Sequence, residues 1–151
     1  MMQPAPLPCG CPALGSARRA VDRYVVRRSV GSSVCSQGVH AHGEPRIVLT
    51  LRGSFTTRYR VATLRADPAH AVFRTGADEH RDVYERDALC LSIALPPDER
   101  NVAVRAPFVV AGPSFWHIAR HISTEIAHTD QISDLVLSGL CAEVTALVLN
   151  S

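Results

Sequence analysis

Between residues 21 and 95 the chain consists of short β-rich runs at close spacing, and no helical pattern of ten residues interrupts them. Val, Ile, Thr, Tyr and Phe dominate these runs, and Gly, Pro or Asp separates them. Without helices to connect parallel strands, the pattern favours an antiparallel sandwich, jelly roll or barrel. The expected strands are residues 23–30, 46–52, 54–65, 70–74, 81–85 and 88–95, with a short one at 108–112.

After Pro113 the pattern becomes helical. A first segment, with Ser114 placed to cap it, carries one apolar stripe, and a break at residues 128–130 separates it from a second segment. So short a break favours an antiparallel helix pair. The second segment has an apolar face wider than one contact needs, so we expect it to form a homodimer. The expected interface residues are Val136, Leu137, Leu140, Val144 and Leu147.

Length and charge limit the classes of function. A chain of 151 residues suits one domain with a single sizeable core, and a net charge of +2 is too small to indicate a nucleic-acid surface. The sequence has no secretory signal and no uninterrupted run of about 18 apolar residues. We therefore expect a cytoplasmic protein without a membrane segment, and its five cysteines lack the spacing of a disulfide framework or a zinc site.

Two short segments carry histidines at a spacing that is typical of metal ligands. His40 and His42, which share a face in an extended chain, precede a strand that ends at Gly53. This arrangement resembles the first cupin motif, H-x-H-x(3,4)-E-x(6)-G, and "FRTGADEHRDVY" resembles the second, P-x-G-x-x-H, with His80 on its histidine. In a metal-binding cupin the ligands would be these three histidines and the glutamate of the first motif.

The departures from both motifs oppose a metal. Arg46 stands at the glutamate position, Glu44 comes two residues too early, and Thr75 and Ala77 replace the proline and glycine of the second motif. A guanidinium cannot ligate a metal, and its charge opposes a divalent cation. We therefore expect no metal cofactor. If a metal is bound, the ligands are His40, His42 and His80.

The histidines of the first helix and the acidic residues around His80 are not expected to bind a metal or take part in catalysis. His117 and His121 lie four apart on the first helix, which is metal-capable spacing but more typical of a polar helix face. One of the acidic residues around His80 is expected to orient its imidazole. These acidic residues are Asp78, Glu79 and Asp82.

The order of these segments, from the H-x-H pair through "LTLRGSFTTRY", "FRTGADEHRD", "ALCLSIAL" and "AGPSFWHIARHISTEI" to an apolar helix, is similar to the N-terminal sensor half of AraC-type transcription regulators. That resemblance implies a cupin-like double-stranded β-helix, or jelly-roll barrel, followed by a C-terminal α-helical hairpin. The expected organisation is a flexible tail at 1–20, the barrel at 21–112 and the hairpin, as dimerisation element, at 113–151.

The resemblance implies a regulatory sensor and dimerisation domain that lacks the C-terminal helix-turn-helix DNA-binding domain. Such a chain would bind an unknown small-molecule effector and would not read DNA specifically by itself. The expected residues at the rim of the effector pocket are His40, His42, Arg46 and His80. One alternative is a metal-dependent cupin enzyme, a dioxygenase or isomerase that uses the three histidines. Another is a dimerisation module without an effector.

Overall fold

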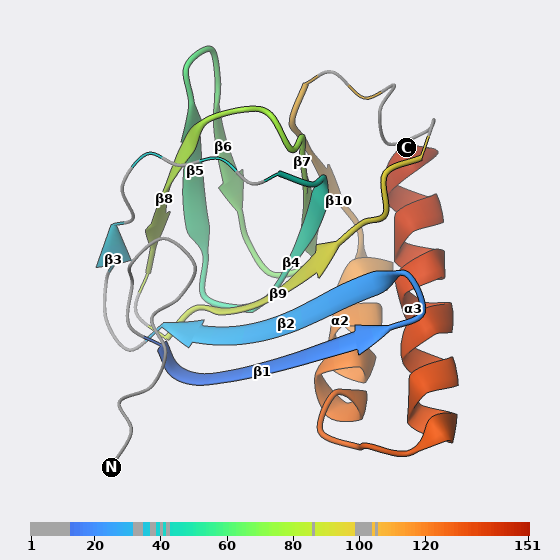
Figure 1. The fold of residues 1–151 in the computed structure, drawn as a ribbon. Coiled ribbons are helices and arrows are strands. Elements are labelled where there is room, and N and C mark those ends of the chain that lie inside the picture. The colour runs from blue at the N-terminus through green and yellow to red at the C-terminus, as the bar shows by residue number, and fades with distance from the viewer. Residues whose placement is uncertain are drawn as a thin grey trace.

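The computed structural model describes residues 13–31, 35–36, 39, 41, 43–85, 87–98, 104 and 106–151. In these ranges the chain forms two antiparallel sheets that pack face to face, followed by two helices (Figure 1). The expected fold class, a cupin-like jelly-roll barrel followed by a helical hairpin, is confirmed.

The larger sheet has the strand order β1-β2-β9-β4-β7-β10. Its strands are β1 (Ala13–Val21), β2 (Tyr24–Gly31), β4 (Arg46–Arg52), β7 (His70–Arg74), β9 (Leu89–Ala94) and β10 (Phe108–Ala111). The smaller sheet has the order β3-β8-β5-β6 and consists of β3 (Cys35–Ser36), β5 (Phe55–Tyr59), β6 (Thr63–Ala66) and β8 (His80–Tyr84). The run expected at 54–65 is thus two strands, joined by a turn that the Tyr59 amide closes on the Ala62 carbonyl at 2.8 Å.

Gly53 directly follows β4, at a position that only glycine occupies without strain. Its φ is +70°, and a Cβ at this position would lie 2.9 Å from Ala88 Cα. A side chain here would meet both backbone strain and a clash. The glycine of the first motif therefore allows the chain to leave β4 and enter β5 in the opposite sheet.

The N-terminal boundary of the barrel was predicted incorrectly. Residues 13–20 were expected in a flexible tail, but they form most of β1, which pairs with β2 from Ala13 to Val21. The segment "ALGSARRAV" is poor in β-branched residues, so its strand conformation comes from pairing rather than from propensity. Arg19 also ties β1 to the C-terminal helix through Asp134, at 2.5 Å.

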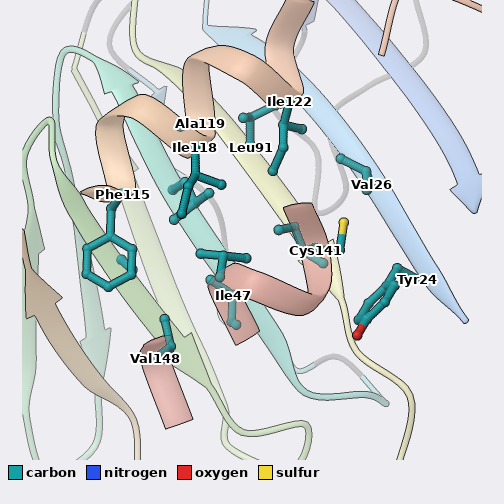
Figure 2. Close-up of a cluster of buried hydrophobic side chains, with 14 of the residues drawn as sticks. Tyr24, Val26, Ile47, Leu91, Phe115, Ile118, Ala119, Ile122, Cys141 and Val148 are labelled. Carbon is teal, nitrogen blue, oxygen red and sulfur yellow. The ribbon is translucent and has the colours of Figure 1, made fainter. Parts of the chain in front are cut away.

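Helices α2 (Pro113–Glu125) and α3 (Gln131–Leu149) cover one face of the larger sheet. Pro113 occupies the first turn of α2 after Gly112, so the cap expected from Ser114 is not made. Asp130 caps α3 by accepting a hydrogen bond from the Ser133 amide at 2.8 Å. Figure 2 shows the core between this sheet face and the helices, where Val26, Ile47 and Leu91 meet side chains of α2 and α3.

Because side chains alternate along a strand, the other face of the larger sheet carries the neighbours of those core residues. Val48 and Val72 pack there against Phe55 of the smaller sheet, in a second core inside the barrel. The larger sheet therefore lies between two cores, one shared with the helices and one shared with the smaller sheet. A change in the shape of the larger sheet therefore alters the packing of both cores.

Helix α3 uses much of its apolar surface inside the chain. Leu137 and Val144, which were expected at a dimer interface, are fully buried against the chain's own core, because α3 packs on both the sheet and α2. Val136 and Leu140 are half-buried, and Leu147 is 41% exposed. The large apolar side chains that α3 exposes are Ile132 (74%), Leu135 (75%) and Leu147.

By its length and composition alone, helix α3 could also cross a membrane. Over an 18-residue window its mean hydropathy is 1.8, and 28% of that window is buried in the fold. The expectation of no membrane segment rested instead on the absence of an uninterrupted run of about 18 apolar residues. The charged residues Asp134 and Glu143 interrupt the apolar sequence of α3, but the mean hydropathy of the window stays at 1.8.

Candidate functional site

The inside of the barrel holds a cluster of polar side chains at one end of β7 and β8. Arg74 ends β7, and His80 and Asp82 alternate along β8, so all three point into the space between the sheets. Their exposed fractions are 4%, 2% and 0%. Arg74 Nη1 lies 2.6 Å from His80 Nε2 and 2.8 Å from Asp82 Oδ2.

The contacts of His80 determine which of its nitrogens carries the hydrogen. A guanidinium only donates, so His80 Nε2 accepts from Arg74. Nδ1 then donates to the Asp78 carbonyl oxygen at 3.2 Å. The acidic residue that orients the imidazole does so through its backbone, and both ring nitrogens are engaged in the fold. A metal at Nε2 would have to displace a buried cation.

Arg74 and Asp82 stabilise each other's charge. Burial opposes ionisation of Asp82, but the charge of Arg74 and its hydrogen bond outweigh burial and hold the Asp82 pKa below its usual range. Burial likewise disfavours the charged guanidinium, yet Asp82 raises the Arg74 pKa above its ordinary value. Both groups are therefore charged at neutral pH.

Aromatic and thiol groups surround this ion pair. The Tyr59 ring lies 5.4 Å from the His80 ring, and the Arg74 guanidinium lies 5.4 Å from the centre of Phe55. Burial, followed by the nearby Asp82 carboxylate, raises the Tyr84 pKa, and burial raises the Cys90 pKa to about 12. The Tyr84 hydroxyl and the Cys90 thiol are therefore protonated at physiological pH.

The cluster has hydrogen-bonding capacity to spare. Within the described part of the chain, the Nε and Nη2 atoms of Arg74 are buried and have no hydrogen-bond acceptor. Leaving such groups without an acceptor costs about 1–3 kcal/mol each. An oxygen-rich ligand that enters the barrel would remove that cost. A cavity of about 350 Å³ opens beside Tyr59, between the β5–β6 turn and residues 77–79.

Arg46, at the glutamate position of the first motif, lies next to this cluster. It is directly opposite Arg74 in the register of β4 and β7. Glu44, two residues earlier, accepts from Arg46 Nη2 at 2.5 Å and from Nε at 3.1 Å. Glu44, which lies two residues before the glutamate position of the motif, thus neutralises Arg46, which stands at that position.

This geometry does not test the predicted rim of the effector pocket. Arg46 lies opposite Arg74 on the neighbouring strand and His80 contacts Arg74, whereas His40 and His42 lie outside the described residues. No group of three or more His, Cys, Asp or Glu side chains suited to a metal occurs among the residues that are described. His117 and His121 are both exposed on α2, as expected for a polar helix face.

Sequence reasoning missed Arg74, the residue at the centre of the cluster. A basic residue at the end of "HAVFR" is normally read as solvent-exposed. The signal that identifies it is alternation, because Val72 and Arg74 fall on the same face of β7. The same alternation places His80, Asp82 and Tyr84 together on β8.

No family profile matches the sequence, and no curated protein matches it. Among solved structures, the AraC-like transcriptional activator CuxR matches with a TM-score of 0.61 at 12% identity, over 85% of this chain and 53% of the activator. A cupin-2 domain protein from Shewanella frigidimarina matches with a TM-score of 0.49 at 9% identity, over 56% of this chain and 82% of its own. KdgF from Halomonas sp. has the same TM-score at 17% identity, over 56% and 79%.

The extent of the first match is informative. A match over 85% of the chain cannot be confined to the barrel, so it reaches into the helical hairpin. This chain spans about half the length of the activator. The expected resemblance to AraC-type regulators is thus confirmed at the level of the fold, and the chain shares its arrangement of barrel and C-terminal helices with an AraC-like transcriptional activator.

Proposed function

We propose that this chain is the sensor and dimerisation domain of an AraC-type regulator. The observation that carries the proposal is the common core of the larger sheet and the two helices. An effector bound on the barrel side of that sheet acts on strands whose opposite face packs on α2 and α3. A ligand that favours one arrangement of sheet and helices shifts the population toward it.

The polar cluster supports an effector on the barrel side. Arg74 has two buried nitrogens without an acceptor in the described chain, and the cavity is lined by Tyr59, whose ring lies 5.4 Å from the ring of His80. A small molecule with carbonyl, carboxylate or phosphate oxygens satisfies these donors. The alternative of a dimerisation module without an effector leaves them unexplained.

The helices support self-association. Ile132, Leu135 and Leu147 lie on α3 and expose apolar surface that no described residue covers. In a regulator whose DNA-binding domain acts as a dimer, such a surface brings two copies together. The corresponding partner is a second copy of this chain, in the cytoplasm.

The enzyme alternative requires His80 as a metal ligand beside His40 and His42. The contact between His80 Nε2 and Arg74 opposes this role, because the lone pair is already engaged and a positive charge lies at the ligand position. Arg46, which is paired with Glu44, supplies no ligand atom at the glutamate position of the first motif. These two arginines favour the regulatory proposal over a metal-dependent reaction.

A reporter assay tests the proposal. The full chain is fused to a DNA-binding domain that occupies its operator only as a dimer, and repression of a reporter gene is measured. We expect repression by the wild type and its loss in Leu135→Asp/Leu147→Asp. Thr63→Asp is the control, since Thr63 is exposed on β6 in the smaller sheet and lies outside both α3 and the lining of the cavity at Tyr59. Equal repression by all three proteins, or by none, contradicts the proposal.

A further inference from the structure

A basic pocket of about 420 Å³ is formed by β1, β2, β4, β9 and the segment that follows β9. Its charged residues are four arginines and one glutamate, a net of three positive charges: Arg18, Arg23, Arg27, Arg46 and Glu44. The remaining wall is largely apolar and includes Val25, Ala94, Leu95, Pro96 and Pro97. The pocket thus combines concentrated positive charge with a surface suited to a carbon skeleton.

The arginines of the basic pocket repel one another. Arg18 lies directly opposite Arg27 in the register of β1 and β2, where like charges destabilise a sheet. Burial and then the charges of Arg46 and Arg18 lower the Arg27 pKa. Among the described residues, no acidic side chain forms an ion pair with Arg18, Arg23 or Arg27, and Glu44 is engaged by Arg46. An anion would remove this repulsion.

We propose that the basic pocket binds a small soluble organic anion with at least two negative charges, a phosphate ester or a polycarboxylate. Guanidinium forks match the oxygens of both groups and bind them through paired hydrogen bonds. Val25, Ala94 and Pro97 then contact the uncharged part of the ligand. As the effector of the domain, this anion rests on the function proposed above; as a ligand of the pocket, it does not.

The β1–β2 ribbon connects this pocket to both helices. Arg18 lines the pocket, and its neighbour Arg19 points to the opposite face, where it contacts Asp134 and Ser133 of α3. On β2, Arg27 lines the pocket and its neighbour Arg28 donates to the Ser123 carbonyl of α2 at 3.0 Å. An anion that draws Arg18 and Arg27 together therefore displaces the residues that hold α2 and α3.

Calorimetric titration of the full chain with pyrophosphate and with citrate, at constant ionic strength, tests the site. The pocket variant is Arg18→Gln/Arg27→Gln. The control variant is Arg58→Gln/Arg81→Gln, which removes another cross-strand arginine pair, exposed on β5 and β8, and changes the net charge equally. We expect one saturable site in the wild type and in the control, and affinity lower by about ten-fold or more in the pocket variant.

The probe that binds distinguishes the two ligand classes, since pyrophosphate represents phosphate esters and citrate represents polycarboxylates. No saturable binding of either probe at millimolar concentration, or equal weakening in the pocket and control variants, overturns the site. Removal of a repulsive pair should leave the thermal midpoint of the pocket variant at or above that of the wild type without anion. If that variant does not fold, Arg23→Gln replaces it, because Arg23 is exposed in the β1–β2 turn.

Hydrogen exchange separates the site from its regulatory role. When pyrophosphate or citrate binds, we expect altered exchange in α2 and α3 as well as around the pocket. Binding without any change in the helices leaves the site standing and overturns its role as an effector site. Failure to bind overturns the site, while dimer-dependent repression in the reporter assay is judged independently of it.

Discussion

Arg74 and Asp82 form an ion pair inside the barrel, with 2.8 Å between Nη1 and Oδ2 and with side chains that are 4% and 0% exposed. Both charged groups are shielded from water, so each is stabilised mainly by the opposite charge of the other. Arg74 also contacts His80, with 2.6 Å between Nη1 and Nε2. One residue pair thus influences both the stability of this barrel and its chemistry.

Replacement of Asp82 by asparagine should destabilise the protein by about 3–5 kcal/mol, because it leaves the Arg74 charge buried without a counter-charge. Urea unfolding followed by circular dichroism measures the loss. The double variant Arg74→Met/Asp82→Leu removes both charges and should be much closer to the wild type. A single variant that loses less than about 1 kcal/mol would show that the guanidinium finds another counter-charge.

Stability should fall in acid because of the same pair. The Asp82 pKa is held below its ordinary value of 3.8, so its contribution is complete above that value and is lost as pH falls through the lower folded-state pKa. Unfolding free energies between pH 7 and pH 2 measure the slope. Asp82→Asn should flatten that slope below pH 4, whereas Glu143→Gln, an exposed change on α3, should leave it as in the wild type.

Protein purified without chelator should carry well under one equivalent of zinc, iron, manganese or nickel. The reason is that Arg74 occupies His80 Nε2 and Arg46 replaces the motif glutamate. Elemental analysis by mass spectrometry measures the content. Near-stoichiometric metal that disappears in His40→Ala/His42→Ala would instead favour the metal-dependent enzyme.

The features predicted best from sequence are those set by local periodicity. The strand runs and the two helical stripes predicted the barrel and the hairpin, since apolar alternation and 3.6-residue spacing act over a few residues. Strand β1 was missed because its conformation depends on pairing with β2 and on the contact of Arg19 with α3. Those partners are close in space, but Asp134 lies far along the chain.

The site was harder to predict because its chemistry depends on cross-strand register. Nothing near Arg74 in sequence indicates that it faces Arg46 on β4 or that Asp82 on β8 neutralises it. The dimer face was misjudged for a related reason. A wide apolar helix face is the same in sequence whether a sheet or a second chain covers it, and Leu137 and Val144 face this chain's own sheet.

The chain should bind DNA weakly and without sequence preference. A net charge of +2 releases few counterions from the phosphate backbone, and α2 and α3 pack on the sheet rather than forming a recognition unit. A mobility-shift titration at physiological salt measures this. Sequence-selective binding at nanomolar concentration would contradict the prediction, and added heparin separates selective from purely electrostatic retention.

The last prediction is that α3 forms a homodimer with micromolar affinity. Its exposed stripe combines the large side chains of Ile132, Leu135 and Leu147 with small residues between them, Gly139, Ala142 and Ala146. The positions from Ile132 to Ala146 recur at intervals of three and four, so they lie along one side of the helix, and Leu147 adjoins Ala146 at the edge of that side. The small residues permit close approach of a second helix. Burial of this stripe in both copies contributes a few kcal/mol beyond the cost of association, at about 25 cal/mol per Å².

Sedimentation velocity across a concentration series measures the assembly. The wild type should form dimers at tens of micromolar, and Leu135→Asp/Leu147→Asp should stay monomeric and folded, because neither side chain lies in the core. Leu137→Asp, a matched change on the buried side of α3, should instead unfold the domain. A wild type that is monomeric at these concentrations overturns the prediction. Dimers that survive the double change place the interface on another surface.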